Sequence, residues 1–536
     1  MAEARKVSFG LRSRQHALAT PDRTAIISIE SDGSETKLSC RELDRKAAQI
    51  ARRLQARGVG RNMLVGIALP DGVEHYITAI AAWRLGACVL PLNAAMAAGE
   101  RDALMKVMRS QGVALIVGDW PVKERVIAGA DFEEIFSCEA GDPIADVTPQ
   151  PGKAIASGGS TGRPKIIVDP KPWAHAPGEW GMLNKMGFGA GQTQLVAGRL
   201  HHNIGFMLGH IGLFEGHTLV VTPRFDADAA LDLIERHRVQ FVGLIPIMMQ
   251  RMAKSAAFAA RNLSSLEGVF HSGAACPDWV KRCWIERVGA EKIWETYGAT
   301  EGNGTTLISG DEWLKHPGSV GRAYQSEIRI VGETGDEAPT GEIGEIYMRM
   351  ARAGGGLLGD AKPDDRDYDY LGAERLRETS DGFSSVGDMG RLDADGFLYI
   401  ADRRVDMIVT GGVNVYPAEV EAVLSAHPGV GDVVVIGAPD GEWGCRVHAI
   451  VEPAEWPSAV TVDDLNRFCR ERITAYKTPK SYEFMKALPR DPSGKIRRPA
   501  LREERAEGWT PAMTPVQRRM NSGASPAGEA ASRKGR

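Results

Sequence analysis

Residues 157–168 read Ser-Gly-Gly-Ser-Thr-Gly-Arg-Pro-Lys-Ile-Ile-Val, a glycine-rich segment that leads into an apolar run. Glycines let backbone N–H groups approach an anion closely, and the segment adds hydroxyl donors and the positive charge of Lys165. It therefore suits a polyphosphate. It is not a Walker A loop, which needs Gly-Lys-Ser/Thr in sequence, because Pro164 precedes Lys165 and Ile166 follows it. Taken alone, the segment could equally be an ordinary surface turn.

The composition excludes several classes of function. Of the 536 residues, 43% are hydrophobic and 25% are charged, as in an ordinary globular chain. The net charge of −4 shows no excess of basic residues of the kind that favours nucleic-acid binding. The seven cysteines are scattered and never form a Cys-x-x-Cys pair, which argues against a disulfide framework and against a zinc site. Their pattern predicts a reducing compartment.

The ends of the chain and its apolar stretches predict a cytoplasmic protein. Residues 1–10 contain no apolar core of a secretory signal. The longest apolar stretch, residues 76–98, is interrupted by Arg84 and falls short of a clean membrane span. Residues 507–536 are rich in small and polar residues without periodicity, which predicts a disordered tail.

Apolar periodicity predicts an α/β fold. Residues 40–57 place apolar side chains at the spacing of one helix face. Short apolar runs typical of buried strands lie at residues 64–69, 114–117, 219–221 and 241–245, separated by helix-length segments. Strands that alternate with helices indicate a mostly parallel sheet covered on both faces. The alternation continues over residues 418–502, a length sufficient for a small α+β domain.

The most specific motif is Trp-Glu-Thr-Tyr-Gly-Ala-Thr-Glu-Gly at residues 294–302. Tyr297 offers a flat face for adenine, Thr300 a hydroxyl for an α-phosphate, and Glu301 a hard oxygen ligand. Mg²⁺ prefers one or two carboxylates together with phosphate oxygens and water. Alone, a core tyrosine and a solvated glutamate would explain the pattern. Together with the glycine-rich segment, we interpret it as part of a nucleotide and metal site.

Four weaker segments also carry polar or small residues in predicted loops. The stretch 271–277, His-Ser-Gly-Ala-Ala-Cys-Pro, leaves room for a flat ring to lie against the backbone, although such loops are common turns. The others are a histidine pair at residues 201–202, Gly387-Asp388, and a Gly-Lys pair at residues 494–495. A structural histidine would be the ordinary interpretation of the pair at residues 201–202, and a surface lysine that of Lys495.

In this order, the motifs resemble those of adenylate-forming enzymes, the superfamily of acyl-CoA synthetases, adenylation domains and firefly-type luciferases. The resemblance extends over about residues 15–502. It implies an α/β fold with a large N-terminal domain of packed, mostly parallel sheets and helices over residues 1–402. A small, mobile α+β lid domain, residues 403–506, would follow, and the tail would begin at residue 507. The clearest departure is Val405 at the hinge, where the family usually has Asp or Lys.

The resemblance assigns roles to individual residues. Catalytic roles fall to His202, Thr300, Glu301 and Lys495, and magnesium would be held by Glu301 and Thr161. Lys495 would reach the α-phosphate and the attacking carboxylate, where it would neutralise charge that builds in the transition state. Backbone at Gly411 and Gly412 would approach the pantetheine arm of CoA. The implied nucleotide-binding residues are Ser157, Gly159, Ser160, Thr161, Gly162, Lys165, Ser272, Gly273, Ala274, Ala275, Glu295, Thr296, Tyr297, Gly298, Asp388, Ile400 and Arg403. The implied acyl pocket consists of His202, Phe206, Ile247, Met248, Ser272, Gly273 and Gly302.

The implied activity is that of an ATP-dependent, AMP-forming acid–CoA ligase. A carboxylic acid and ATP would give an acyl-adenylate and diphosphate, and the thiol of CoA would then displace AMP. The expected partners are thus a small-molecule acid, ATP and CoA, with Mg²⁺ as cofactor and without nucleic acid, and the protein would be a monomer or homodimer. The form of the phosphate loop resembles that of bacterial bile-acid and steroid-acid CoA ligases. It favours a bulky alicyclic or aromatic acid, or a medium-to-long acyl acid.

Two other functions stay open. A stand-alone adenylating enzyme would load a separate carrier protein, and a non-catalytic homologue would only bind nucleotide. No carrier-protein segment with an attachment serine follows the small domain, which favours free CoA. The presence of Glu301, Asp388, Arg403 and Lys495 argues against the non-catalytic alternative.

Overall fold

The computed structural model describes residues 5–110, 115–138, 141, 144–158, 164–351, 368–403, 405–410, 413–440, 443–490 and 495–505. The predicted tail, 507–536, lies outside these residues. The chain divides into two compact units, Met1–Arg404 with Pro492–Gly494, and Val405–Asp491 with Lys495–Arg536. Among the described residues, no helix combines the length and the apolar character that crossing a lipid bilayer would require.

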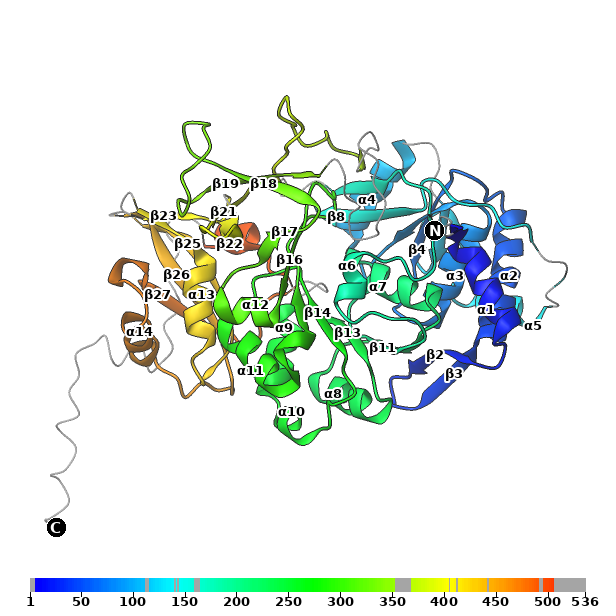
Figure 1. Cartoon of the computed structure of the whole chain (residues 1–536), viewed down its shortest axis with the longest axis horizontal. Helices are drawn as coiled ribbons and strands as arrows, with labels where there is room; N and C mark the ends of the chain where they lie inside the picture. The colour runs from blue at the N-terminus through cyan, green and yellow to red at the C-terminus, as the bar shows by residue number, and fades with distance from the viewer. Residues whose placement is uncertain are drawn as a thin grey trace, which may run out of the picture. The chain divides into compact units, whose positions relative to one another are not determined.

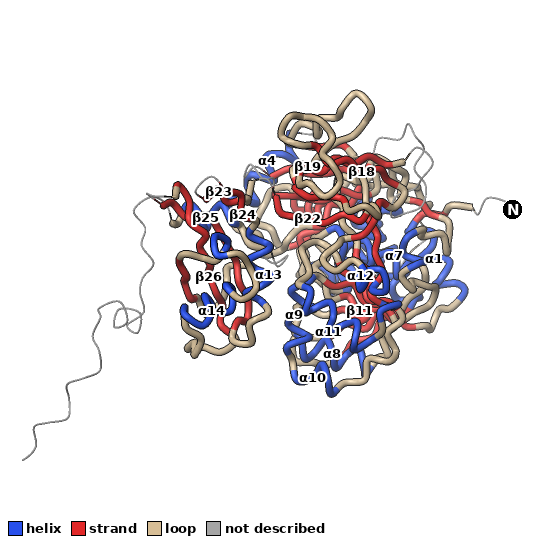
Figure 2. Tube along the Cα trace, turned by 60° about the vertical axis from the view of Figure 1, so that its left-hand side comes forward, coloured by secondary structure: helices blue, strands red, loops and turns tan. Residues whose placement is uncertain are grey.

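The larger sheet of the first unit contains thirteen of the described strands. Strands are drawn in red in Figure 2. In spatial order they are β18 (Ser326–Val331), β19 (Gly344–Met350), β21 (Asp388–Leu392), β22 (Phe397–Arg403), β17 (Gly321–Ala323), β16 (Thr306–Ser309), β15 (Ile293–Glu295), β14 (Gly268–His271), β13 (Phe241–Leu244), β11 (Thr193–Val196), β12 (Thr218–Val221), β2 (Thr24–Ile29) and β3 (Glu35–Ser39). Strands β15, β14, β13, β11, β12 and β2 run parallel. From β15 to β18 neighbours are antiparallel.

A second sheet of this unit has seven described strands. Their order is β20 (Asp369–Leu371), β9 (Pro164–Asp169), β8 (Lys153–Gly158), β5 (Cys88–Pro91), β4 (Leu64–Ala68), β6 (Leu115–Gly118) and β7 (Arg125–Ile127). A separate pair joins β1 (Val7–Ser8) to β10 (Ala174–His175). The strands β4, β6, β12 and β13 fall on the four apolar runs that the sequence predicted, so the α/β fold is confirmed.

Helices connect the strands of this unit and cover the sheets. They are α1 (Phe9–Ala19), α2 (Cys40–Ala56), α3 (Val73–Arg84), α4 (Ala98–Ser110), α5 (Asp131–Ser137), α6 (Met182–Lys185), α7 (Asn203–Phe214), α8 (Ala227–Arg236), α9 (Pro246–Lys254), α10 (Ala256–Ala260), α11 (Asp278–Val288) and α12 (Gly310–Lys315). Helix α2 confirms the periodicity seen at residues 40–57. It begins with a capping box, in which Ser39 and Glu42 satisfy each other's backbone N–H groups.

Alternate strand residues build the cores on the two faces of each sheet. One core lies between the sheets: it contains Val65 and Val89 of the smaller sheet, Leu219 of the larger, and side chains of α2, α3 and α7. On the outer face of the larger sheet, Val220 and Val242 pack against α8, α9 and α11. On the outer face of the smaller sheet, Leu90 packs against α4. Figure 1 shows α9 and α11 beside β13 and β14. The first unit thus forms alternating helical and sheet layers.

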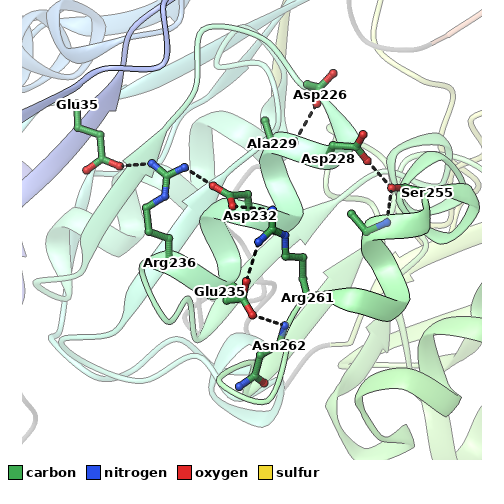
Figure 3. Close-up of polar contacts among 11 residues, drawn as sticks. Glu35, Asp226, Asp228, Ala229, Asp232, Glu235, Arg236, Ser255, Arg261 and Asn262 are labelled. Atoms are coloured by element: carbon green, nitrogen blue, oxygen red, sulfur yellow. Dashed lines mark hydrogen bonds and ion pairs between the residues drawn. The ribbon is translucent and has the colours of Figure 1, made fainter.

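Surface ion pairs tie α8 to its neighbours (Figure 3). Arg236 donates to Glu35 at the start of β3, with 2.8 Å between Nη1 and Oε1. Arg261, after α10, donates to Glu235 over 3.2 Å. The Arg236 and Arg261 side chains are 49% and 43% exposed, so each pair contributes at most about 1 kcal/mol to stability. We assign this network a structural role.

The second unit is a small α+β fold. Strands β25 (Val430–Asp440), β26 (Gly444–Pro453) and β27 (Ser481–Phe484) form its sheet, and β23 (Ile408–Thr410) pairs with β24 (Val413–Val415). Helices α13 (Pro417–Ser425) and α14 (Val462–Arg470) pack on the face that includes Val433 and Val435. Leu501 of α15 (Arg498–Glu503) packs on the face that includes Val434 and Ile436.

Candidate active site

The candidate residues of the first unit follow the carboxyl ends of adjacent parallel strands. His202 follows β11, Ile247 follows β13, Ser272 follows β14 and Thr296 follows β15. These strands are neighbours in the order β15-β14-β13-β11. In open α/β sheets, ligands bind in the crevice outside the carboxyl ends of the strands. The topology therefore brings four segments that are far apart in sequence to one edge of the sheet.

Glu301 and Lys165 form an ion pair between the two sheets. Lys165 lies on β9 of the smaller sheet, and its Nζ stands 2.9 Å from Oε1 of Glu301, which follows β15 of the larger sheet. The Glu301 side chain is only 9% exposed. Burial alone would raise its pKa, but hydrogen bonds from Tyr370 and Lys165 and the charge of Lys165 outweigh burial and hold the pKa below its ordinary value. Glu301 is therefore ionised at neutral pH.

This carboxylate fits the predicted magnesium ligand. It is a hard oxygen donor, it is ionised, and it lies beside the ammonium of Lys165. Thr300 beside it is half-buried. The loop that carries both residues is closed by a hydrogen bond of 2.8 Å from the Thr306 N–H to the Tyr297 carbonyl, and Gly298 bridges to Thr305.

The glycine-rich segment is more strand-like than the sequence indicated. Ser157 pairs with Lys165 and Gly158 with Pro164, so these residues belong to the hairpin of β8 and β9. Lys165, expected within the loop, projects from a strand. Strand pairing fixes its backbone, which explains how the lysine meets Glu301. The predicted residues Gly159, Ser160, Thr161 and Gly162 lie outside the described residues.

Strands β21 and β22 bring several of the predicted nucleotide-binding residues together. Tyr297 donates a hydrogen bond of 2.8 Å to Oδ2 of Asp388. Asp388 and Arg403 are directly opposite each other in the antiparallel register of these strands. Ile400 pairs with Gly390 in the same ladder. The tyrosine, the acidic residue and the arginine backbone are thus neighbours in the structure.

The small-residue loop after β14 has an open face. Gly273, Ala274 and Ala275 are exposed. Ser272 is buried, and its Oγ donates a hydrogen bond of 2.7 Å to the carbonyl of Thr296 in the neighbouring loop. This bond ties the loops after β14 and β15 together. Ser272 therefore positions the backbone on which a flat ring could lie.

The side chain of Glu295, which was predicted among the nucleotide-binding residues, pairs with a lysine of the protein. Its carboxylate is buried and hydrogen-bonded by the buried ammonium of Lys281 on α11. Its pKa is raised by burial, which the charge of Lys281 only partly offsets. Lys281 lies outside the motifs recognised in the sequence. A signal was present, because Lys281 shares one helix face with apolar Trp284, Ile285 and Val288.

The candidate acyl-pocket residues lie on both faces of the larger sheet. Phe206, on α7, is completely buried in the core between the sheets, whereas Met248, on α9, belongs to the outer core. Side chains from both sides approach Gly273, because a Cβ atom there would lie 3.8 Å from both Ile204 and Ile245. Thus Gly273 leaves room where α7 and the start of α9 approach one loop.

Two other pocket candidates border this region. His202 is the residue immediately before α7, and its ring lies 4.3 Å from that of His201. Gly302 has a φ of +71°, and a Cβ atom there would meet nothing within 4 Å. The first turn of α7 and the loop after β15 therefore both contribute residues that could border an acyl group.

Lys495 belongs to the second unit, where its side chain is exposed. It precedes α15, whose Arg498 donates two hydrogen bonds of 2.8 Å to Glu421 of α13. Val405, which the sequence predicted at a hinge, has an exposed side chain, and its carbonyl accepts a hydrogen bond of 2.8 Å from Arg502. The predicted CoA-binding residues Gly411 and Gly412 lie outside the described residues.

The fold and the site together define a nucleotide-binding enzyme of the adenylate-forming type. Residues 13–357 match the family described as AMP-binding enzyme, and residues 419–495 match the AMP-binding enzyme C-terminal domain. The chain belongs to this family. The resemblance noted from the motifs is confirmed.

Several characterised relatives align with nearly the whole chain. Long-chain-fatty-acid–CoA ligase FadD13 of Mycobacterium tuberculosis is 29% identical over 517 residues, which cover 93% of this chain and 98% of that protein. Feruloyl-CoA synthase of an Amycolatopsis species is 31% identical over 476 residues, covering 86% and 92%. The structure of O-succinylbenzoate coenzyme A synthetase from Bacillus subtilis in complex with AMP matches with a TM-score of 0.73 at 25% identity, covering 93% and 98%.

Proposed function

We propose that the protein is an ATP-dependent acid–CoA ligase that forms AMP and diphosphate through an acyl-adenylate. The observation that carries the proposal is the ionised Glu301 paired with Lys165 at the edge where four strand ends converge. The relatives named above support it, because all three carry names of acid–CoA ligases.

In the first half-reaction, a carboxylate oxygen of the acid attacks the α-phosphorus of ATP and diphosphate leaves. Asp388 would hold the ribose as an acceptor of hydroxyl hydrogen bonds, with its carboxylate oriented by Tyr297. Lys165 would pair with the phosphates, and Lys495 would neutralise charge around the attacked phosphorus. Mg²⁺ bound at Glu301, with Thr161 as a second proposed ligand, would supply further charge neutralisation.

In the second half-reaction, the sulfur of CoA attacks the acyl carbon, the carbon–oxygen bond to AMP breaks, and the thioester forms. We propose that the C-terminal domain predicted at residues 403–506 reorients between the two steps and carries Lys495 away, as gating motions do in many enzymes. The backbone at Gly411 and Gly412 would then approach the pantetheine arm. His202 would border the reacting carboxylate.

We infer that the acid is bulky, either alicyclic or aromatic, or has a medium-to-long acyl chain. Gly302 supports this inference, since a Cβ atom there would meet nothing within 4 Å, and a Cβ atom at Gly273 would only reach van der Waals contact with Ile204 and Ile245. The names of the relatives refer to acids of these kinds, namely long-chain fatty acids, ferulate and succinylbenzoate. We further propose that the enzyme works in the cytoplasm as a monomer or homodimer, which cell fractionation and light scattering would test.

The test is release of AMP from ATP across acetate, octanoate, benzoate, cinnamate and cholate, each with and without CoA. AMP that appears with a bulky acid and depends on CoA is the expected result. AMP or diphosphate exchange that is indifferent to CoA would instead indicate an enzyme that loads a carrier protein. ATP binding without turnover of any acid would support a non-catalytic homologue.

A further inference from the structure

Tyr370 shares the polar cluster of Lys165 and Glu301, although no motif of the sequence includes it. Its hydroxyl donates a hydrogen bond to Oε1 of Glu301 and accepts one of 2.7 Å from Nζ of Lys165. The same ammonium stands 2.9 Å from Oε1 and 4.1 Å from the centre of the tyrosine ring. The phenol, the ammonium and the carboxylate therefore close a triangle of hydrogen bonds.

Strand pairing sets this position. Strand β20 lies beside β9, and Tyr370 is directly opposite Ile167. Side chains two residues apart on a strand share a face, as do residues opposite each other on neighbouring strands. Lys165 and Tyr370 therefore project from the same face of the smaller sheet. The phenol is thus held at the end of the glycine-rich hairpin by backbone hydrogen bonds.

The phenol is suited to donate to an anion. Burial and the neighbouring carboxylate raise the pKa of Tyr370, so the hydroxyl keeps its proton. Its single proton is directed at Glu301 in this structure. A bound polyphosphate would bring other anionic oxygens to the same ammonium and phenol. Hydrogen bonds to charged acceptors are about twice as strong as neutral ones.

The order of the residues in the loop after β15 indicates which part of the nucleotide would lie beside Tyr370. Tyr297, at its start, contacts Asp388 on the side proposed for ribose, and Glu301, four residues later, contacts the smaller sheet. The triangle of hydrogen bonds therefore lies away from the side where Tyr297 contacts Asp388, which is the side proposed for the nucleoside. A β- or γ-phosphate reaches further in that direction than the α-phosphate of AMP does.

We propose that Tyr370 is a further polyphosphate-binding residue of this site. When ATP binds, the phenol turns from Glu301 and donates its hydrogen bond to a β- or γ-phosphate oxygen, while Lys165 pairs with the same phosphates. Glu301 is thereby released from two of its donors and becomes available to a cation. The inference rests on the proposed function, because it requires ATP as the ligand.

The experiment compares the affinities of the full-length protein for ATP and for AMP by isothermal titration calorimetry at fixed magnesium, without acid or CoA. The variant is Tyr370→Phe, which removes the hydroxyl and keeps the ring. The matched control is Tyr368→Phe in the same region. The Tyr368 ring lies 4.8 Å from that of Tyr370, but its hydroxyl accepts a hydrogen bond of 3.0 Å from the Leu376 N–H.

We expect Tyr370→Phe to weaken ATP binding about tenfold, the effect of about one charge-assisted hydrogen bond, and to leave AMP binding unchanged. Tyr368→Phe should change neither affinity. Equal losses for ATP and AMP, or an ATP affinity that Tyr370→Phe does not change, would overturn this inference while leaving the proposed function in place. Wild-type protein that binds no ATP would overturn the proposed function and this inference with it.

Discussion

Tyr297 donates a hydrogen bond to Asp388, with 2.8 Å between Oη and Oδ2, and joins two segments that are 91 positions apart. The bond connects the loop after β15 to the start of β21, where Asp388 is opposite Arg403. Three residues that the sequence assigned separately to a nucleotide site therefore belong to one arrangement. In it, the orientation of the acidic side chain depends on the tyrosine.

This arrangement predicts the effect of Asp388→Asn. The amide keeps the shape of the side chain, but one acceptor oxygen becomes a donor, so the ribose hydroxyls lose part of their partner. We expect the KM for ATP to rise about tenfold, with a smaller change in kcat. Steady-state kinetics with varied ATP measures this. Asp395→Asn, in the exposed turn between β21 and β22, is the control, and an unchanged KM for ATP would contradict the ribose assignment.

Glu301→Gln should weaken the dependence on magnesium selectively. Glutamine retains an oxygen that can accept from Lys165 and Tyr370, but it lacks the charge that a hard divalent cation prefers. We expect the magnesium concentration for half-maximal activity to rise at least about tenfold. Activity is measured against free magnesium at saturating ATP. Exposed Glu342→Gln serves as the control, and superimposable magnesium curves for Glu301→Gln and wild type would rule out the metal assignment.

Lys495→Ala should separate the two half-reactions. Loss of the ammonium removes charge stabilisation from the attack on the α-phosphorus. We therefore expect the rate of acyl-adenylate formation to fall about a hundredfold or more. The reaction of preformed acyl-adenylate with CoA should change little, because diphosphate has already left. Exposed Lys486→Ala is the control. Equal loss in both half-reactions would show that Lys495 has another role.

His210 predicts a loss of stability in acid. It is completely buried on α7, its Nδ1 lies 2.7 Å from the Phe206 carbonyl, and burial lowers its pKa to about 4. The unfolded chain, with a histidine pKa near 6.5, binds more protons between these values, so stability falls as the pH falls from about 6.5 to 4. For this histidine the loss is about 2 kcal/mol at pH 5 relative to pH 8.

Urea unfolding at pH 8 and pH 5 measures this contribution. His210→Phe places a ring that does not titrate among Tyr76, Trp83 and Phe206, which surround the histidine. The decrease in unfolding free energy between the two pH values should be about 2 kcal/mol smaller in the variant than in wild type. Identical decreases would show that His210 does not cause this part of the acid sensitivity.

The sequence predicted elements whose causes are local. The apolar period at residues 40–57 and the cap at Ser39 produce α2 (Cys40–Ala56), and the runs at 219–221 and 241–245 are β12 and β13. The Tyr-Gly-x-Thr-Glu motif was informative because it directly follows the last parallel strand, β15. Its place at the sheet edge is then a consequence of topology.

The sequence could not predict contacts that depend on how distant segments pair. Tyr370 reaches Glu301 only because β20 aligns beside β9, and no spacing in the sequence records that alignment. Lys165 was expected in a loop, but pairing between β8 and β9 extends the strand to include it. Lys281 was different: a charge on an apolar helix face was a visible sign of a buried partner.

In the proposed mechanism the acid becomes joined to AMP at this site. The direct test uses an accepted acid whose carboxylate carries ¹⁸O, with ATP, magnesium and CoA, followed by mass spectrometry of the AMP. A carboxylate oxygen that attacks the α-phosphorus stays with the phosphate when the thiol takes the acyl group. We therefore predict AMP that contains one ¹⁸O atom per thioester formed. Thioester formed together with unlabelled AMP, or with ADP, would contradict the acyl-adenylate route.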